Sequence, residues 1–349
     1  MSENPLVSDK RVGKYEAIAF NLFKLEHFKP AILAALNEAE ANFELVRNNP
    51  ERPTFENTIL ALDNGSEHLS VVYGVYNNLY SVHSDNEFKA LGQELSPLMS
   101  EFNSKINTDD KLFASIKAIY NARKEYSEDA ETVTLIEETY DNFVRGGAML
   151  VGEDKEKMKE INKELSILNL KFSQNVLNAT NKFSLHITDK EELTGLPEGA
   201  LNAAAYNAKK RGKDGGWMFT LQQSSILPVL TYAENRTLRE KISRASSSRS
   251  YKDEFDNQKI VNRITVLRGK RAKLLGYNTH ADFTLVKRMA EKPQNVLDFL
   301  DRIYEKAMHV AEKEVAELQE LAKADGVTEL MPWDVAFYSE KLKKQKFDF

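Results

Sequence analysis

The sequence predicts a mainly α-helical fold, a multi-helix lobe with one small antiparallel β element. Apolar residues recur three and four positions apart through most of the 349 residues, which is the spacing of helices that bury one face. The spacing changes to strict alternation in two short segments, 183–188 and 217–222, and this indicates two strands. The content of 42% hydrophobic and 29% charged residues is typical of a globular protein.

The first predicted region, residues 1–180, is a series of amphipathic helices. Several of the predicted starts are placed at side chains that carry an oxygen. Such a side chain can cap a helix because it accepts a hydrogen bond from an N–H group of the first turn. The expected starts are Pro30, Thr54, the segment across Asn64 and Gly65, Asp85, Asp109 or Asp110, and Ser127. Gly146 and Gly147 should end the helix that Ser127 caps. Pro97 should kink the helix that follows Asp85, since proline removes an interior hydrogen bond.

Two further regions follow along the chain. Residues 181–234 should form a small β/α element, in which the two strands flank a short helix that starts at Pro197. Residues 235–349 return to helices, and the longest should run from Pro293 to just before Gly326, about 45 Å at 1.5 Å per residue. The last helix should start at Pro332, and the chain then ends on two phenylalanines, Phe347 and Phe349.

Charge and composition exclude several classes of function. Lysine and arginine number 48 against 53 aspartates and glutamates, a net charge of −5, which argues against a nucleic-acid partner. The one basic group, Arg268, Lys270, Arg271 and Lys273, is expected to be a solvated helix face. No apolar run approaches the ~20 residues of a membrane span. The absence of cysteine excludes disulfides and thiol chemistry, and with no secretory signal at the start it favours the cytoplasm.

The histidines give no sign of a metal site. They are His27, His68, His83, His186, His280 and His309, and no two stand at a short ligand spacing. Structural roles are therefore expected for them: burial beside a hydrogen-bond partner for His83, and a place in the first turn of a helix for His280. His309 should be paired with charges on its own helix face, and His186 should lie on the polar side of its strand. We predict no metal-binding residue and no bound cofactor in this chain.

Motifs for nucleophilic or phosphate chemistry are also missing from the sequence. There is no Gly-x-Ser-x-Gly, no Ser-x-x-Lys and no glycine-rich phosphate loop followed by Lys-Ser or Lys-Thr. The paired glycines in RGGAML and KDGGW are interpreted as helix-end and turn residues. From the residues alone no catalytic site can be predicted, and the substrate-binding residues are unknown.

Several stretches taken together resemble a known family. FNLFKLEHFKPAILAAL, NPERPTFENTILALDNG, YDNFVRGGAML, INKELSILNLKFSQNVLNAT, LTYAENRTLREKISRA, LRGKRAKLLGYNTHADF and PWDVAFYSEKL are similar, in this order, to the amino-terminal half of the thimet-oligopeptidase family of zinc metallopeptidases. The resemblance runs from about Phe20 to the last residue. FVRGGA, at 143–148, is closer to the dipeptidyl carboxypeptidase (peptidyl-dipeptidase) branch than to the oligopeptidase branches.

The resemblance implies a function for a larger protein. Family members hydrolyse short peptides in a deep channel between two helical lobes, and this branch releases carboxy-terminal dipeptides. Their zinc is held by His-Glu-x-x-His on a helix, with the glutamate as general base. No such motif occurs here. We therefore expect this chain to be an amino-terminal, non-catalytic portion that ends before the zinc-binding part, shapes the channel and is inactive alone.

The resemblance also suggests partners. These are short peptides, the missing catalytic half, and a second copy of the chain through surface that this half would cover; neither nucleic acid nor membrane is expected. Arg145, Arg236 and Arg249 could face the channel, although pairing with nearby carboxylates is the favoured interpretation for each. The alternative function is a free-standing, non-catalytic helical protein that binds peptides or proteins.

Overall fold

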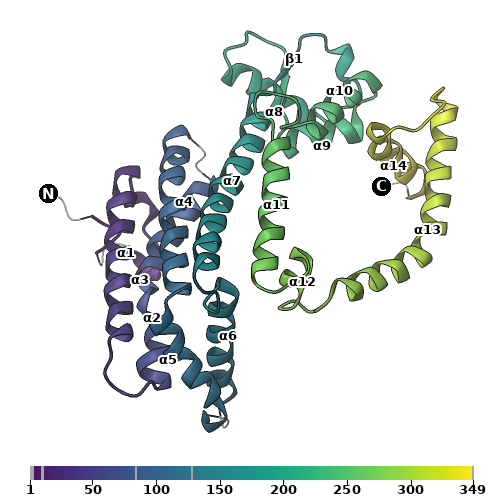
Figure 1. Cartoon of the computed structure of the whole chain (residues 1–349). Coiled ribbons are helices and arrows are strands. Elements are labelled where there is room, and N and C mark those ends of the chain that lie inside the picture. The colour runs from purple at the N-terminus through teal and green to yellow at the C-terminus, as the bar shows by residue number, and fades with distance from the viewer. Residues whose placement is uncertain (1–3, 9–11, 83–84, 127–128, 348–349) are drawn as a thin grey trace. The chain divides into compact units, whose positions relative to one another are not determined.

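A computed structural model describes residues 4–8, 12–82, 85–126 and 129–347 of the protein (Figure 1). The fold is mainly α-helical, with one two-stranded antiparallel sheet in the described ranges, as the sequence predicts. The chain divides into two compact units: residues 1–171 with 264–280, here the helical unit, and residues 172–263 with 281–349, here the mixed unit. The predicted regions 1–180, 181–234 and 235–349 are stretches of sequence, and they stay a prediction beside this division in space.

No helix among the described residues combines the length and the apolar character needed to cross a membrane.

The helical unit consists almost entirely of helices joined by short connections. Helix α1 packs against α3 and α4, and α5 packs against α6 (Figure 1). Its elements are α1 (Leu25–Arg47), a π-helical segment (Phe55–Leu60), α2 (Ala61–Gly65), α3 (Glu67–Val82), α4 (Asn86–Asn107), α5 (Asp110–Asn121), α6 (Ala130–Gly146), the first part of α7 (Glu153–Lys182) and the last part of α11 (Gln258–Leu274). Three short 3-10 turns accompany them, at Lys14–Glu16, Phe20–Leu22 and Arg123–Tyr126.

Three of the six predicted helix starts in this unit are confirmed by their caps. Thr54 accepts a hydrogen bond from the Asn57 N–H, Asp85 from the Phe88 N–H, and Asp109 from the N–H groups of the first turn of α5. These bonds satisfy donors that the first turn of a helix leaves unpaired. Gly147 ends α6 in the left-handed conformation, with φ of 107°. Helix α4 runs on through Pro97.

One predicted start was wrong, and another falls outside the described residues. Helix α1 begins at Leu25 instead of after Pro30, because the His27 Nδ1 atom accepts a hydrogen bond from the Lys24 N–H at 3.1 Å and fixes an earlier first turn. Ser127 lies outside the described residues, and the side chain that caps α6 is that of Asp129, which accepts from the Glu131 N–H.

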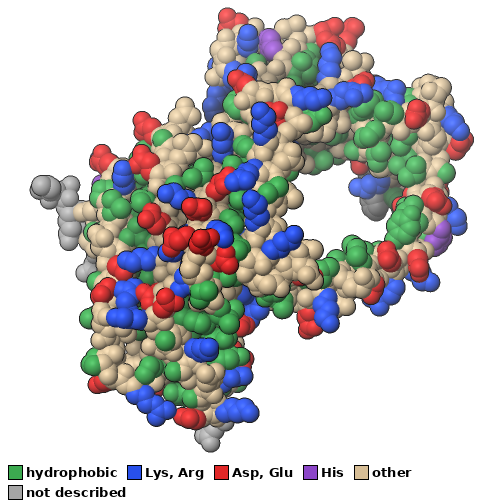
Figure 2. Space-filling view, viewed as in Figure 1, with side chains coloured by type: hydrophobic (Ala, Val, Ile, Leu, Met, Phe, Trp, Pro, Cys, Tyr) green, Lys and Arg blue, Asp and Glu red, His purple; other side chains and the backbone are tan. Residues whose placement is uncertain are grey.

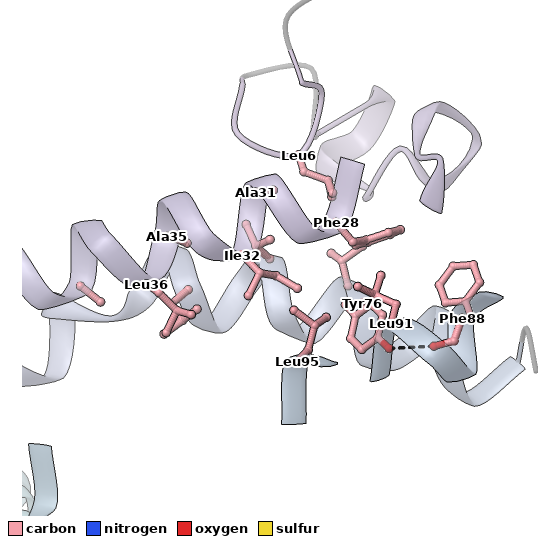
Figure 3. Packing of buried hydrophobic residues seen from close by; sticks show 14 residues of the cluster. Leu6, Phe28, Ala31, Ile32, Ala35, Leu36, Tyr76, Phe88, Leu91 and Leu95 are labelled. Carbon is pink, nitrogen blue, oxygen red and sulfur yellow. Dashed lines mark hydrogen bonds between the residues drawn. The ribbon is translucent and has the colours of Figure 1, made fainter. Parts of the chain in front are cut away.

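The core of the helical unit is rich in aromatic side chains. The ring of Phe28 on α1 lies 5.6 Å from that of Tyr76 on α3 and 5.9 Å from that of Phe88 on α4, measured between centroids (Figure 3). The Tyr76 hydroxyl donates a hydrogen bond of 3.2 Å to the Phe88 carbonyl oxygen. Burial raises the pKa of Tyr76, so its hydroxyl stays protonated and continues to donate. Leu6, Ile32 and Leu95 are fully buried around these rings.

The mixed unit contains the sheet. Strand β1 (Leu185–Ile187) pairs antiparallel with β2 (Trp217–Phe219), with Leu185 opposite Phe219 and Ile187 opposite Trp217. The intervening helix is α8 (Glu198–Lys210), which follows Pro197 as predicted. The remaining helices are α9 (Gln223–Tyr232), α10 (Arg236–Ser247), the first turns of α11 (Gln258–Leu274), α12 (His280–Leu285), α13 (Pro293–Ala324) and α14 (Pro332–Phe347).

Helix α13 has the predicted bounds but is covered only at its end. Its C-terminal turns pack on α14, where Leu318, Ala322 and Tyr338 form a small buried cluster. Toward its N-terminus, Leu297, Leu300 and Ile303 are about half exposed. A long amphipathic helix therefore leaves much of its apolar face open to solvent.

Candidate binding cavity beside helix α14

A buried carboxylate organises the start of helix α14. Pro332 opens the helix, and Asp334 in its first turn is 0% exposed. The Asp334 Oδ2 atom accepts a hydrogen bond of 3.1 Å from the Met331 N–H, which is one of the donors that the helix start leaves unpaired. A carboxylate is favourable here because the N-terminus of a helix carries partial positive charge.

Two arginines of helix α10 complete the coordination of this carboxylate. Arg236 and Arg239 are three residues apart and so lie on one face of α10. The Arg236 Nη2 atom lies 2.7 Å from Oδ2 of Asp334, and its Nε atom lies 3.1 Å from both carboxylate oxygens. The Arg239 Nη2 atom lies 2.8 Å from Oδ1. Burial raises the pKa of Asp334, but the hydrogen bonds from the two arginines outweigh burial, and the pKa lies below its ordinary value.

Arg239 also joins three helices. It is 1% exposed and donates to the carbonyl oxygens of Ala233 and Glu234, at the end of α9, and to that of Trp333 in α14. Its guanidinium carbon lies 4.2 Å from the centroid of the Phe337 ring, within the range of a cation–π contact. The packing of α9, α10 and α14 therefore depends on one buried arginine that donates to three backbone carbonyls and to one carboxylate.

A cavity of ≈ 540 Å³ lies beside this network. Its lining comes from α9, α10, α14 and the turn after α13, and charged side chains of both signs reach it. The Lys341 Nζ atom is 2.5 Å from an oxygen of Asp325, and the Lys344 Nζ atom is 5.4 Å from the centroid of the Tyr232 ring. The Arg236 side chain remains 42% exposed at the cavity.

Two titratable groups in and beside this cavity have pKa values far from neutral pH. The Asp334 carboxylate is held ionised by its donors, and burial together with Asp325 raises the pKa of the Tyr338 hydroxyl. Neither group is therefore poised to exchange a proton near neutral pH. What the cavity offers a ligand is a set of fixed charges beside aromatic rings.

The three arginines singled out in the sequence have different surroundings. Arg236 is paired with a carboxylate, as favoured. Arg249 instead donates to two uncharged oxygens, the Ser246 carbonyl at 2.9 Å and Thr180 Oγ1 at 3.0 Å, so the expected carboxylate pairing was wrong for this residue. Arg145 lies on α6 and is partly buried. That any of them faces a substrate channel stays a prediction.

Among the described residues, no group of three or more histidine, cysteine, aspartate or glutamate side chains is placed to hold a metal ion. His280 begins α12, as predicted, and burial together with Arg271 and Arg268 lowers its pKa. His186 was predicted to lie on the polar side of its strand. Its Nε2 atom lies 3.0 Å from the Gly215 carbonyl oxygen, which agrees with this prediction.

The other histidines have separate surroundings. His27 takes part in the start of α1, and the Nδ1 atom of His68 is 2.6 Å from Glu38 Oε2. His309 lies exposed on α13. His83, expected to be buried beside a partner, lies outside the described residues.

Reasoning from the sequence did not find the cavity. The sequence analysis predicts a helix start at Pro332, but nothing in the spacing shows that Asp334 in its first turn is buried between two arginines. Nothing in the sequence indicates that Arg239 is buried, because it lies in a predicted helix that is rich in basic residues. The short segment Pro-Trp-Asp at 332–334, in which two apolar residues precede a carboxylate, is the one local hint that this carboxylate is buried.

Comparison with known proteins shows that the sequence is similar to those of peptidases. Residues 229–349, which include α10, α13 and α14, match Peptidase family M3. The chain is 37% identical to oligopeptidase A of Haemophilus influenzae over 94% of its length and 49% of that protein. It is 32% identical to dipeptidyl carboxypeptidase of Escherichia coli over 96% of its length and 49% of that protein, and 33% identical to E. coli oligopeptidase A, with coverages of 99% and 51%.

These matches confirm the predicted resemblance to the thimet-oligopeptidase family. The chain is similar to metallopeptidases of family M3, and it fits an amino-terminal part of such a protein. It spans about half the length of the curated relatives that it matches.

Proposed function

We propose that this chain is the non-catalytic portion of a zinc-dependent peptidase that hydrolyses short peptides. The observation that carries the proposal is the uneven coverage: similarity extends over 94% to 99% of the chain but only about half of each relative. In this proposal the chain contributes a helical lobe that shapes the substrate channel, and the remaining half supplies the chemistry.

The residues present do not fit a zinc site. The sequence lacks His-Glu-x-x-His, and the described part of the chain brings no set of three ligand-type side chains together. We therefore assign zinc to the part of the relatives that this chain does not match. No step of hydrolysis is assigned to any residue of this chain.

The open face of helix α13 supports a second lobe as partner. Leu297, Leu300, Ile303 and Val310 are each 45% to 52% exposed along one helix, and hydrophobic side chains are visible along it in Figure 2. Contiguous exposed apolar surface usually marks an interaction site. We propose that the half of the protein outside this chain covers this face, and that without it two copies of the chain pair through the same surface.

Release of carboxy-terminal dipeptides is the finer part of the proposal. It rests on the FVRGGA segment at 143–148. The identities of 37% and 33% to oligopeptidase A proteins and of 32% to a dipeptidyl carboxypeptidase are too close to separate the two activities. A cytoplasmic location belongs to the same proposal and is favoured by the absence of cysteine.

The test starts with the purified 349-residue chain. We expect it to hold no stoichiometric zinc and to give no chelator-sensitive hydrolysis of a short peptide with a free carboxyl end. Continuing the reading frame of the gene past the codon for Phe349 should reveal His-Glu-x-x-His. The protein with that region included should bind zinc, and mass spectrometry of its products decides between dipeptide release and internal cleavage.

Two outcomes would contradict the proposal. Chelator-sensitive peptide hydrolysis by the 349-residue chain would place catalysis within it. A stop codon directly after Phe349 would favour the alternative, a free-standing protein that binds peptides or proteins without cleaving them.

A further inference from the structure

A second pocket lies in the mixed unit, where the loop between α10 and α11 meets helix α7. Its volume is ≈ 380 Å³, within the range of small-ligand sites. Apolar walls come from Phe172 and Val176 on α7 and from Val261 on α11, and the loop supplies polar groups that include Ser250. We call this cavity the Ser250 pocket.

The Ser250 hydroxyl is the feature that points to a ligand. The residue is 5% exposed, and its Oγ atom is buried without a hydrogen-bond partner among the described residues. Buried hydroxyls are nearly always hydrogen-bonded, because desolvating one without a partner is unfavourable. Ser250 lines the pocket, so a rotation of its side chain about χ1 would offer this hydroxyl to a molecule that enters.

The backbone of the loop that carries this hydroxyl is strained at Ser250. Ser250 and Lys252 have φ angles of 58° and 57°, in the left-handed region that residues with a side chain seldom adopt. Two hydrogen bonds fix the turn: the Ser250 N–H donates to Asp253 Oδ2 at 3.0 Å, and the Ser250 carbonyl accepts from the Asn257 N–H at 2.9 Å. Strain that is held by such bonds is commonly found at binding and catalytic sites.

The walls of the pocket are also fixed before any ligand arrives. Asn257 is 4% exposed; its Nδ2 atom donates to the Phe172 carbonyl at 3.1 Å, and its Oδ1 atom accepts from Asn175 Nδ2 at 2.9 Å. Arg249 is tied to Ser246 and Thr180 by the bonds described above. A site that is already ordered loses little entropy on binding.

We propose that the Ser250 pocket binds one residue of an extended peptide. A hydroxyl both donates and accepts, so it can pair with a backbone N–H or carbonyl of the peptide, while Phe172, Val176 and Val261 receive an apolar side chain. A neutral peptide segment is favoured over an anion because the only lining arginine, Arg249, already donates to two oxygens. This inference rests on the proposed function and adds a binding subsite to it.

The experiment measures peptide binding by the isolated 349-residue chain, which requires neither zinc nor catalysis. The probe is a dye-labelled Ala-Ala-Leu-Ala-Ala peptide with both ends blocked, followed by fluorescence polarisation. Ser250→Ala should weaken binding about tenfold, the loss of one hydrogen bond to a buried partner. Val261→Phe should abolish binding, because the larger ring fills the pocket from a side chain that is 45% exposed and tolerates the change.

Val266→Phe is the matched control. Val266 lies on the same helix, is 49% exposed and does not line the pocket. The Val266→Phe variant should therefore bind the peptide with the affinity of the wild type. Circular dichroism confirms that each variant is folded. The inference is overturned if both pocket variants bind the peptide as the wild type does, or if the wild type does not bind it. The Ser250 hydroxyl would then have only a bound water as its hydrogen-bond partner. The proposed function is judged separately, by the hydrolysis and zinc measurements.

Discussion

Asp334 is the single residue on which the packing of α14 most depends. Its carboxylate is fully buried and accepts hydrogen bonds from two arginines and from the backbone. Replacing such a buried pair by apolar residues can be neutral, but removing one partner leaves uncompensated charge in a desolvated site. The energetic importance of Asp334 therefore lies in what its loss does to Arg239.

The first prediction concerns the loss of this carboxylate. Asp334→Ala should lower the free energy of unfolding by about 3–5 kcal/mol, because Arg239 stays buried without its counter-ion. Urea denaturation followed by circular dichroism measures the change. Glu329→Gln, at an exposed position just before α14, is the control and should change the same quantity by less than about 0.5 kcal/mol. Equal stability of the two variants would show that the arginines find other partners.

The second prediction is a dependence of stability on pH. The pKa of Asp334 is lower in the folded protein than the value of about 3.9 in an unfolded chain. On acidification the unfolded state therefore binds the proton first. The stabilisation is complete above about pH 5 and is lost as pH falls through the folded-state pKa. Over this range the free energy of unfolding should fall more steeply for the wild type than for Asp334→Asn, and parallel curves would exclude the carboxylate as the cause.

At the scale of elements, the connection before α8 is fixed by its contact with the end of α9. The Glu234 N–H donates to the Thr194 carbonyl oxygen at 2.9 Å. Gly195 beside it has φ of 89°, and a β-carbon at this position would lie 2.3 Å from the Tyr232 carbonyl oxygen. Only glycine fits, because both the backbone conformation and the close approach exclude a side chain.

The third prediction compares two glycines of this element. Gly195→Ala should destabilise the protein by more than about 1 kcal/mol, through strain and the clash with Tyr232. Gly199→Ala, in α8 with no atom within 4 Å of the added carbon, should instead stabilise it by up to about 1 kcal/mol. Thermal unfolding of both variants gives the two signs, and a stabilising Gly195→Ala would mean that the chain relaxes away from the contact.

At the scale of the whole molecule, the open face of α13 leads to the fourth prediction. If this face pairs two copies of the isolated chain, Leu300→Asp should weaken the dimer by tenfold or more, since burial of a leucine contributes roughly 1.5–3 kcal/mol. Glu305→Ala, on the opposite side of the helix, should leave association unchanged. Sedimentation equilibrium measures both, and a wild-type chain that stays monomeric would contradict the pairing.

Much of the secondary structure was predictable because it depends on nearby residues. The caps at Thr54, Asp85 and Asp109 and the bounds of α13 follow from short-range hydrogen bonding and from apolar spacing. The start of α1 was missed because a histidine in its first turn, and not a standard capping residue, fixes it. Capping preferences therefore mispredict a helix start when a residue that rarely caps, such as this histidine, accepts the hydrogen bond.

The sequence by itself determined the helical class, the position of the two strands and the similarity to a peptidase family, because periodicity and ordered similarity are properties of the chain. Only the tertiary structure decided that Asp334 meets Arg236 and Arg239, nearly a hundred positions away, and that Ser250 keeps a buried, unused hydroxyl. The physical reason is that burial and pairing depend on which elements pack together. That packing is set by contacts between residues that are remote in the sequence. Local sequence patterns do not predict such contacts.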